Sequence, residues 1–326
     1  MKGRSRFGDA SLAFVAFGLF TASLVFAQAA DYPRAAVKIV VGATPGGTVD
    51  TIARLLAEGL SGQLKQPVVV DNRPGANGAI AADVVAKAKA DGYTLLLGTS
   101  GLTILPLLQK SLPYQLTRDL APVAMTAVTP FLLFAGPQSQ ASSVPALIAY
   151  AKANPGRLSV ASGDGTTLMA SELFKAAAGI EVISANYRGG SQMVTDIAGG
   201  AVDYGFLGAT AVMPLAKAGR LRVLAVASGR RLEIAPDVAT LSELGVGGVT
   251  MEPWSGIMVP KGTDARIVQT LENALAIVVQ TEHYQKRVAE IGSLPRFLGA
   301  DAASKWIAAE QKTLEAVAAS AGIRPE

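Results

Sequence analysis

The sequence predicts an α/β protein made of two doubly wound domains, and three observations support this. The chain has 326 residues, which is too long for one typical domain and suits two. Half of the residues are hydrophobic and none is a cysteine, so two apolar cores must hold the fold without disulfide bonds. Short β-branched runs alternate with alanine-rich helical stretches, the pattern of parallel strands joined by right-handed crossover helices.

The alternation is clearest in the first hundred residues. A β-branched run at Val37–Val41 predicts a strand, and residues 48–63 predict a helix with apolar side chains on one face. A second strand at residues 68–70 ends in a dense turn signal. A helix over residues 77–89 and a strand at residues 94–98 follow, so each predicted strand leads into a helix.

The same alternation continues to the C-terminus. Further strands are predicted at residues 158–161, 182–184, 202–206 and 221–227, and further helices at residues 264–280, 282–290 and 302–319. Two apolar, strand-like segments flanked by proline, Phe131–Ala135 and the run from Glu252 to Val259, are interpreted as crossings between domains. The predicted domains are therefore residues 30–130 together with 252–326, and residues 131–251.

The N-terminus has the pattern of a secretory signal. Three basic residues precede an apolar stretch from Ala10 to Phe26, and the small residues Ala27 and Ala29 occupy positions that signal peptidase reads. We expect residues 1–29 to be a cleaved signal peptide and the mature chain, from Ala30, to be a soluble periplasmic monomer. The alternative is an uncleaved membrane anchor, because the apolar stretch approaches the lower limit for spanning a bilayer.

The charge pattern excludes a nucleic-acid partner. Without the first 29 residues the net charge is +2, and no run of lysine or arginine is present. Catalytic signals are also missing. The chain has one histidine, no cysteine, no nucleophile elbow and no dinucleotide or phosphate-loop fingerprint. We therefore expect no catalytic residue, no metal and no cofactor, and a protein that is not an enzyme.

Three strand-to-helix loops have an unusual composition. They are Gly42–Asp50, Gly98–Gly101 and Ser162–Thr167. In open α/β sheets ligands bind at this edge, and glycine together with a helix N-terminus exposes backbone N–H groups to an anion without needing arginine. About four charge-assisted hydrogen bonds of about 1.5–3 kcal/mol each, less the cost of association, permit micromolar binding of a carboxylate.

Two acids in these loops leave alternatives open. Asp50 stands in the first turn of its helix, where it either satisfies N–H groups or contacts the ligand. Asp164 either braces its loop or meets an amino group of the ligand. A glycine-rich loop that is only a turn remains the competing interpretation for the first loop.

Several motifs together resemble the Bug family, the solute-binding receptors of tripartite tricarboxylate transporters. They include Pro45–Asp50, Asp71–Gly78, Asp91–Gly98, Tyr187–Gly190 and Gly219–Val226. The resemblance implies a type II periplasmic binding protein, with two domains around a ligand cleft that close like a Venus flytrap. It also implies that membrane transporter subunits are partners, and that the first and third loops clamp a carboxylate. A periplasmic sensor that feeds a signalling receptor is the alternative.

The chain departs from the family pattern at three places. Ala43 replaces an aromatic residue, Leu168 and Met169 replace a histidine, and Leu207-Gly208 replaces an Asp-Asn pair. We expect these changes to make the pocket larger and less polar, and the ligand to be bulkier than a four-carbon dicarboxylate, with an aromatic or branched apolar body. The alternative is that a neighbouring aromatic side chain fills the space.

The expected ligand-binding residues come from the loops and from the family pattern. They are Ala43, Thr44, Gly46, Gly47, Thr48, Asp50, Thr99, Ser100, Gly163, Asp164, Gly165, Thr166, Thr167, Tyr187 and Gly208.

Overall fold

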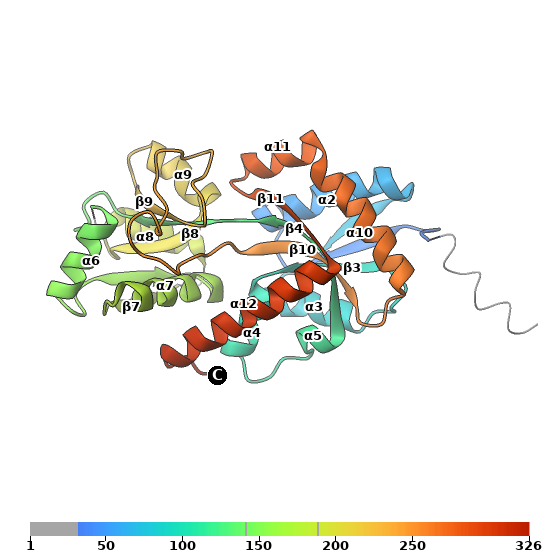
Figure 1. The fold of residues 1–326 in the computed structure, drawn as a ribbon, viewed down its shortest axis with the longest axis horizontal. Coiled ribbons are helices and arrows are strands. Elements are labelled where there is room, and N and C mark those ends of the chain that lie inside the picture. The colour runs from blue at the N-terminus through green and yellow to red at the C-terminus, as the bar shows by residue number, and fades with distance from the viewer. Residues whose placement is uncertain (1–31, 141, 188, 326) are drawn as a thin grey trace, which may run out of the picture.

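The computed structural model describes residues 32–140, 142–187 and 189–325. The predicted signal peptide, residues 1–29, lies outside the described residues. Two sheets, each flanked by helices, stand next to each other (Figure 1). We call the six-stranded sheet and its helices the first domain, and the five-stranded sheet and its helices the second domain.

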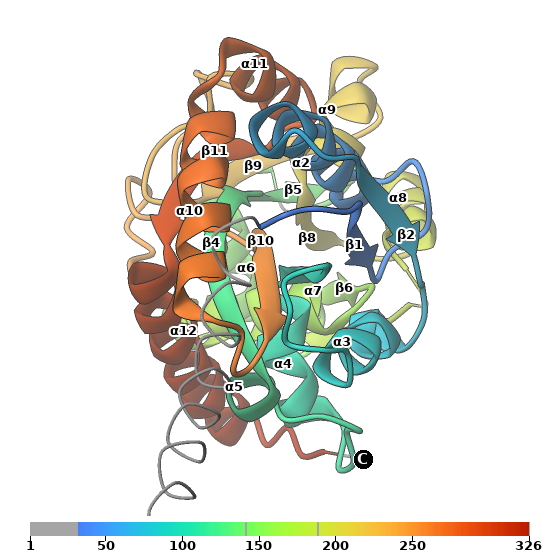
Figure 2. The ribbon, with the colours of Figure 1, turned by 90° about the vertical axis from the view of Figure 1, so that its right-hand side faces the viewer.

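The first domain contains most of the elements. Its strands, in the order β11-β4-β10-β3-β1-β2, are β1 (Val37–Val41), β2 (Val68–Asn72), β3 (Thr94–Thr99), β4 (Leu120–Val128), β10 (Trp254–Pro260) and β11 (Leu294–Gly299). Its helices are α2 (Thr48–Leu64), α3 (Ala79–Ala86), α4 (Gly101–Leu108), α5 (Leu116–Asp119), α10 (Ala265–Gln280), α11 (Glu282–Glu290) and α12 (Ala300–Ser320), with a 3-10 turn η2 (Ala76–Gly78). Figure 2 shows α2 and α11 on one side of this sheet and α3 and α5 on the other.

The second domain is built from one continuous stretch of chain. Its strands, in the order β7-β6-β8-β5-β9, are β5 (Phe131–Ala135), β6 (Ser159–Ser162), β7 (Ile183–Asn186), β8 (Tyr204–Gly208) and β9 (Arg222–Ala227). Its helices are α6 (Val144–Ala153), α7 (Gly165–Ala178), α8 (Gly190–Gly199) and α9 (Ala209–Lys217). Separate apolar clusters cover the two faces of each sheet, which is the doubly wound arrangement that the alternation predicts.

The prediction of parallel strands is confirmed for some of the strand pairs in each sheet and wrong for the others. β1 pairs in parallel with β2 and β3, but β10 is antiparallel to β3 and β4, and β5 is antiparallel to β8 and β9. β5 and β10 begin where the chain has just left the other domain, so they do not follow a crossover helix of their own sheet. The parallel rule applies only to strands joined by such a helix.

Two strands had no prediction. β4 is a long apolar run, and apolar runs of this kind do not by themselves distinguish a strand from a buried helix. β11 contains Pro295, has a register irregularity between Pro295 and Leu298, and lies at the sheet edge next to β4. Proline is tolerated at such an edge because its missing N–H is not needed by a further strand.

α12 belongs to the cores of both domains. Ala303 and Ile307, in its first half, pack in an apolar cluster of the first domain. Leu314 and Ala318, in its second half, pack in the cluster between the second-domain sheet and α7. Figure 1 shows the helix running from the first domain towards α7. In the part of the chain that is described, no helix combines the length and hydropathy needed to span a bilayer.

Candidate ligand-binding cleft

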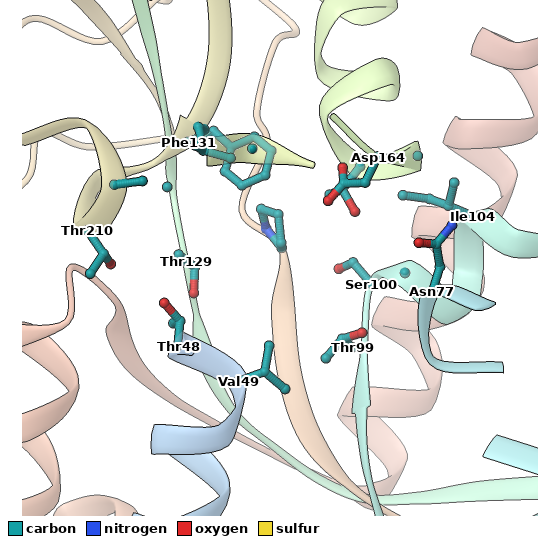
Figure 3. Close-up of a pocket in the computed structure, with 18 of the residues that line it drawn as sticks. Thr48, Val49, Asn77, Thr99, Ser100, Ile104, Thr129, Phe131, Asp164 and Thr210 are labelled. Atoms are coloured by element: carbon teal, nitrogen blue, oxygen red, sulfur yellow. The ribbon is translucent and has the colours of Figure 1, made fainter. Parts of the chain in front are cut away.

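A cleft of about 770 Å³ lies between the two sheets and is lined by residues of both domains (Figure 3). Among the described elements, five helices begin at its wall: α2 and α4 from the first domain, and α7, α8 and α9 from the second. Each follows a strand directly or by a short loop, so the cleft stands at the edge where α/β sheets bind ligands.

Most of these helix N-termini carry no side-chain cap. The residues that precede α2, α4, α8 and α9 are Gly47, Ser100, Gly189 and Gly208, and none of them provides a side-chain acceptor for the N–H groups of the first turn. The first N–H groups of a helix have no partner within the helix and carry a partial positive charge. These groups are therefore available to an anion in the cleft.

Side-chain charge contributes little to the lining. Of the described residues around the cleft, Asp164 is the one that is charged, and neither lysine nor arginine is among them. Hydroxyl groups are frequent instead, and within the described chain those of Thr48, Thr99 and Thr166 make no hydrogen bond with the protein. An anion bound here would be held by backbone N–H groups and hydroxyls.

The cleft is apolar over much of its wall. Ile104, Leu105 and Leu108 of α4 line it, together with the rings of Phe131 and Trp254. Val194, Leu207 and Leu215 of the second domain extend the apolar surface. In Figure 3, Thr48, Thr129 and Thr210 gather at one end and Ile104 stands at the other. Ser100, Asn77 and Asp164 lie near Ile104, and Phe131 lies near Thr210, so apolar and polar groups alternate along the cleft.

The structure brings part of the predicted set together. Thr48, Thr99, Ser100, Asp164, Gly165, Thr166 and Gly208 line the cleft. Ala43, Thr44, Gly46, Gly47, Asp50, Gly163, Thr167 and Tyr187 are not among the lining residues. Thr44, Gly46 and Gly47 are nevertheless exposed in the loop that leads into α2, so this loop stands at the cleft without facing its interior.

Asp50 braces the first loop from behind. It is 2% exposed, and its carboxylate accepts hydrogen bonds from the Gly46 N–H (2.9 Å), Asn72 Nδ2 (2.8 Å) and Arg54 Nε (2.9 Å). Burial acts to raise the pKa of this carboxyl, but the hydrogen bonds from Arg54, Gly46 and Asn72 outweigh burial and hold its pKa below the usual range. Asp50 is saturated by protein donors and supports the loop.

Asp164 and Thr167 form a capping box at the start of α7. The Thr167 N–H donates to Asp164 Oδ1 (2.8 Å), and Thr167 Oγ1 accepts from the N–H groups of Gly163 (2.8 Å) and Asp164 (2.9 Å). Asp164 therefore braces its loop, which is one of the two roles that the sequence left open for it. Thr167 is fully buried and acts only in the cap.

Gly163 is required by the approach of two loops. A Cβ atom on Gly163 would lie 2.9 Å from backbone atoms of Gly189 and Gly190, which precede and begin α8. Such contacts do not occur between real atoms, so a side chain here would push the two loops apart. This glycine sets the distance between the N-termini of α7 and α8.

The three departures from the family pattern lie at different distances from the cleft. Ala43 lines a separate pocket of about 70 Å³ behind the cleft, together with Gly78 and Leu97. Met169 is fully buried in the second-domain core, and its neighbour Leu168 is not among the cleft residues, so the expectation that this pair enlarges the cleft was wrong. Leu207 does line the cleft and makes it less polar.

Tyr187 packs within the second domain. It lies against the cluster of α8 and α9, and its hydroxyl is directed to Asp196. Burial, and then the hydrogen bond and charge of Asp196, raise the pKa of Tyr187. Trp254, by contrast, lines the cleft and is 2% exposed. Of these two aromatic residues, Trp254 is the one placed to fill space in the cleft.

Several lining residues were missed from the sequence. They include Asn77, Thr129, Phe131, Ser191, Thr195 and Thr210. Asn77 had a detectable signal, because it precedes Gly78 in a turn and adopts a left-handed backbone with φ of 52°. The others belong to ordinary helix starts and strand ends or, for Thr195, to the middle of α8, where residue type carries no mark of a ligand.

The domains contact each other on both sides of the cleft. On one side Gly165 approaches α4 so closely that a Cβ on it would lie 2.7 Å from Leu108 Cδ1. On the other side the Thr210 hydroxyl donates to the Ile291 carbonyl, and a Cβ on Gly292 would lie 3.1 Å from the Thr210 nitrogen.

Within residues 32–140, 142–187 and 189–325, no group of three or more His, Cys, Asp or Glu side chains could hold a metal ion.

Comparison with known proteins gives a consistent result. A model of the tripartite tricarboxylate transporter family receptor matches residues 52–323. Protein BugT of Bordetella pertussis (strain Tohama I) is 36% identical over 309 residues, which cover 92% of this chain and 93% of BugT. The solved structure of R. palustris Rpa4515 with adipate is 35% identical, with a TM-score of 0.80 over 91% of this chain and all of that one.

A more distant structure shares the fold. MatC (Rpa3494) from Rhodopseudomonas palustris with bound malate is 26% identical, with a TM-score of 0.73 over 88% of this chain and all of MatC. The cleft lies between two doubly wound domains, and the family match extends over most of the chain. The chain belongs to the tripartite tricarboxylate transporter receptor family.

Proposed function

We propose that this chain is a periplasmic receptor that captures a small organic carboxylate and delivers it to the membrane subunits of a tripartite tricarboxylate transporter. The observation that carries the proposal is the convergence of five helix N-termini on one cleft, four of them without a side-chain cap. Uncapped N–H groups favour an anion at this place, and the receptor is proposed to work as a monomer without catalytic activity.

The ligand is proposed to be bulkier than a four-carbon dicarboxylate. The aliphatic wall formed by Ile104, Leu108 and Leu207, with the Trp254 ring, suits a methylene chain or an aromatic body. The hydroxyls of Thr48, Thr129 and Thr210, which lie near one another, suit the carboxylate. The similar protein Rpa4515 of R. palustris was solved with adipate, a six-carbon dicarboxylate, and adipate is therefore the first compound to test.

The two domains are proposed to close on the ligand as flytrap receptors do. The division is residues 30–130 with 252–326 against residues 131–251, and the strands of each sheet come from these stretches. The second half of α12 departs from this division, because Leu314 and Ala318 pack in the second-domain core. α12 is thus shared by both bodies.

Gly47→Val tests whether the first helix N-terminus binds the carboxylate. A Cβ on Gly47 would meet no atom closer than the Thr44 oxygen at 3.9 Å, and its φ of −83° suits any residue, so the fold should tolerate valine. The bulk should keep an anion away from the α2 N–H groups and weaken adipate binding at least tenfold, about 1.4 kcal/mol. Titration calorimetry measures this.

The matched control is Gly62→Val on the same helix, where an added Cβ also meets nothing within 4 Å. It should bind adipate as the wild type does. Wild-type affinity in Gly47→Val would remove α2 from the site. If the wild type binds none of adipate, succinate and benzoate, the proposed function itself is contradicted.

A further inference from the structure

Glu310 is an acid of α12 that points into the first domain behind the cleft. Its carboxylate accepts hydrogen bonds from Ser100 Oγ (3.0 Å), Thr103 Oγ1 (2.7 Å) and Trp254 Nε1 (2.7 Å). Ser100 Oγ in turn accepts from the Trp254 N–H (2.9 Å). A single side chain therefore joins the start of α4, the start of β10 and the middle of α12.

Two of these three donors belong to the cleft wall. Ser100 and Trp254 line the cleft and are almost fully buried, whereas Glu310 does not line it. Because Ser100 donates to Glu310 and accepts from Trp254, its hydroxyl is committed to the protein. Its position, and that of the Trp254 indole, is set from behind by Glu310.

The environment of the Glu310 carboxylate lowers the stability of the fold. All three donors are neutral, and within the described residues no ion pair involves Glu310. Although the residue as a whole is only partly buried, burial of its carboxyl group raises its pKa above the usual range, and the three hydrogen bonds act in the opposite direction. A carboxylate without a cation in such a place costs stability, and an apolar or amide side chain would avoid that cost.

Glu310 also stands at the junction of the two domains. On α12, Ile307 precedes it in a first-domain cluster, and Leu314 follows it in the second-domain core. On α4, Ile104 lies next to Thr103 in the sequence and packs in that same second-domain core. A movement of the second domain must therefore carry α12 and α4 with it or break these apolar contacts.

We propose that Glu310 is a positioning residue of the binding site. It holds the Trp254 indole and the Ser100 hydroxyl in the cleft wall and ties them to α12. Ligand binding in the cleft is thereby coupled to the packing of the second half of α12 against the second domain. This inference rests on the proposed carboxylate-binding function and adds a residue that does not touch the ligand.

The experiment uses Trp254 as its own reporter. The chain has two tryptophans, so Trp306→Phe leaves Trp254 as the only one. In this background Glu310→Ala should change the Trp254 emission of the ligand-free protein and weaken adipate binding more than tenfold. Glu310→Gln, whose amide oxygen still accepts from the indole, should give a smaller change in emission and a three- to tenfold loss. Glu315→Gln, an exposed acid of the same helix, should change neither.

Hydrogen exchange measures the coupling to α12. Adipate should slow exchange of the amides at residues 311–320 in the parent protein and not in Glu310→Ala. Unchanged emission and unchanged adipate affinity in both Glu310 variants would overturn the inference. If Glu310→Ala does not fold, Glu310→Gln decides by the same two measurements.

The design separates this inference from the proposed function. If the parent protein binds no carboxylate, the proposed function fails, and the ligand-free emission still tests whether Glu310 positions Trp254. If the parent binds adipate and the Glu310 variants match it in emission and affinity, only the present inference fails.

Discussion

Asp50 and Glu310 stand behind two parts of the first-domain wall and brace it in different ways. Asp50 holds the loop before α2 and has Arg54 beside it, with Nε at 2.9 Å. Glu310 holds Ser100 before α4, and the described donors that contact its carboxylate are neutral. Burial raises the pKa of both carboxyls, but at Asp50 the hydrogen bonds from Arg54, Gly46 and Asn72 reverse the direction.

The comparison shows that a buried carboxylate can support a cleft wall at different costs in folding stability. With a guanidinium nearby, a buried acid remains charged at a lower cost in stability than it would alone. Without a cation, a buried carboxylate retains the unfavourable free energy of desolvation. We therefore interpret Asp50 as a residue that stabilises the fold, and Glu310 as a residue that positions the binding site.

The largest effect on stability is expected from Asp50→Ala. The substitution removes the acceptor of the Gly46 N–H and one acceptor each of Asn72, which still donates to the Ala43 carbonyl, and of Arg54, which still donates to Asn72. A hydrogen bond to a charged group contributes about 1.5–3 kcal/mol. We expect the free energy of unfolding in urea to fall by about 2–3 kcal/mol. Asp301→Ala, which removes an exposed partner of Lys305, should stay within about 0.5 kcal/mol of wild type. A loss at Asp50 no larger than at Asp301 would contradict the brace.

The pH dependence of stability should have opposite signs at the two acids. The lowered pKa of Asp50 means that its stabilisation is present above the unfolded value of about 4 and is lost as pH falls through the folded value. The raised pKa of Glu310 means that its contribution is most favourable in acid and declines as pH rises through the folded value.

Two isosteric variants measure these signs. In urea unfolding between pH 3 and pH 7, the stability of wild type relative to Asp50→Asn should shrink on acidification. The stability of wild type relative to Glu310→Gln should grow over the same range. Two differences that move in the same direction with pH would show that the acids are not in contrasting environments.

The smallest effect is expected in the second-domain wall. The Thr166 hydroxyl lines the cleft and makes no hydrogen bond with the described protein. Thr166→Ala should weaken adipate binding by about 0.5–1.5 kcal/mol, the worth of one ordinary hydrogen bond, and leave the unfolding midpoint unchanged. Thr313→Ala, an exposed threonine of α12, is the control and should bind normally. Equal affinities in the two variants would exclude Thr166 from ligand contact.

Much of the fold was predictable because it depends on neighbours in the chain. The β-branched run at Val37–Val41 forms β1 with the predicted bounds, and α2 begins at Thr48 as predicted. β11 could not be predicted in the same way. Its residues are neither β-branched nor alternating, and it exists because β4 offers an unpaired edge from a distant part of the chain.

The candidate site likewise has features that depend on neighbouring residues and features that depend on long-range packing. Residue order alone determined the family, the glycine-rich loops and the helix starts that make an anion site, since turns and helix N-termini need only a few adjacent residues. Tertiary structure alone decided that Asp50 faces Arg54 and Asn72 and does not line the cleft, and that Met169 lies in a core. It also decided that Glu310 reaches Ser100 across 210 positions of sequence. Contacts at such separation follow from how whole helices pack, and local pattern contains no information about them.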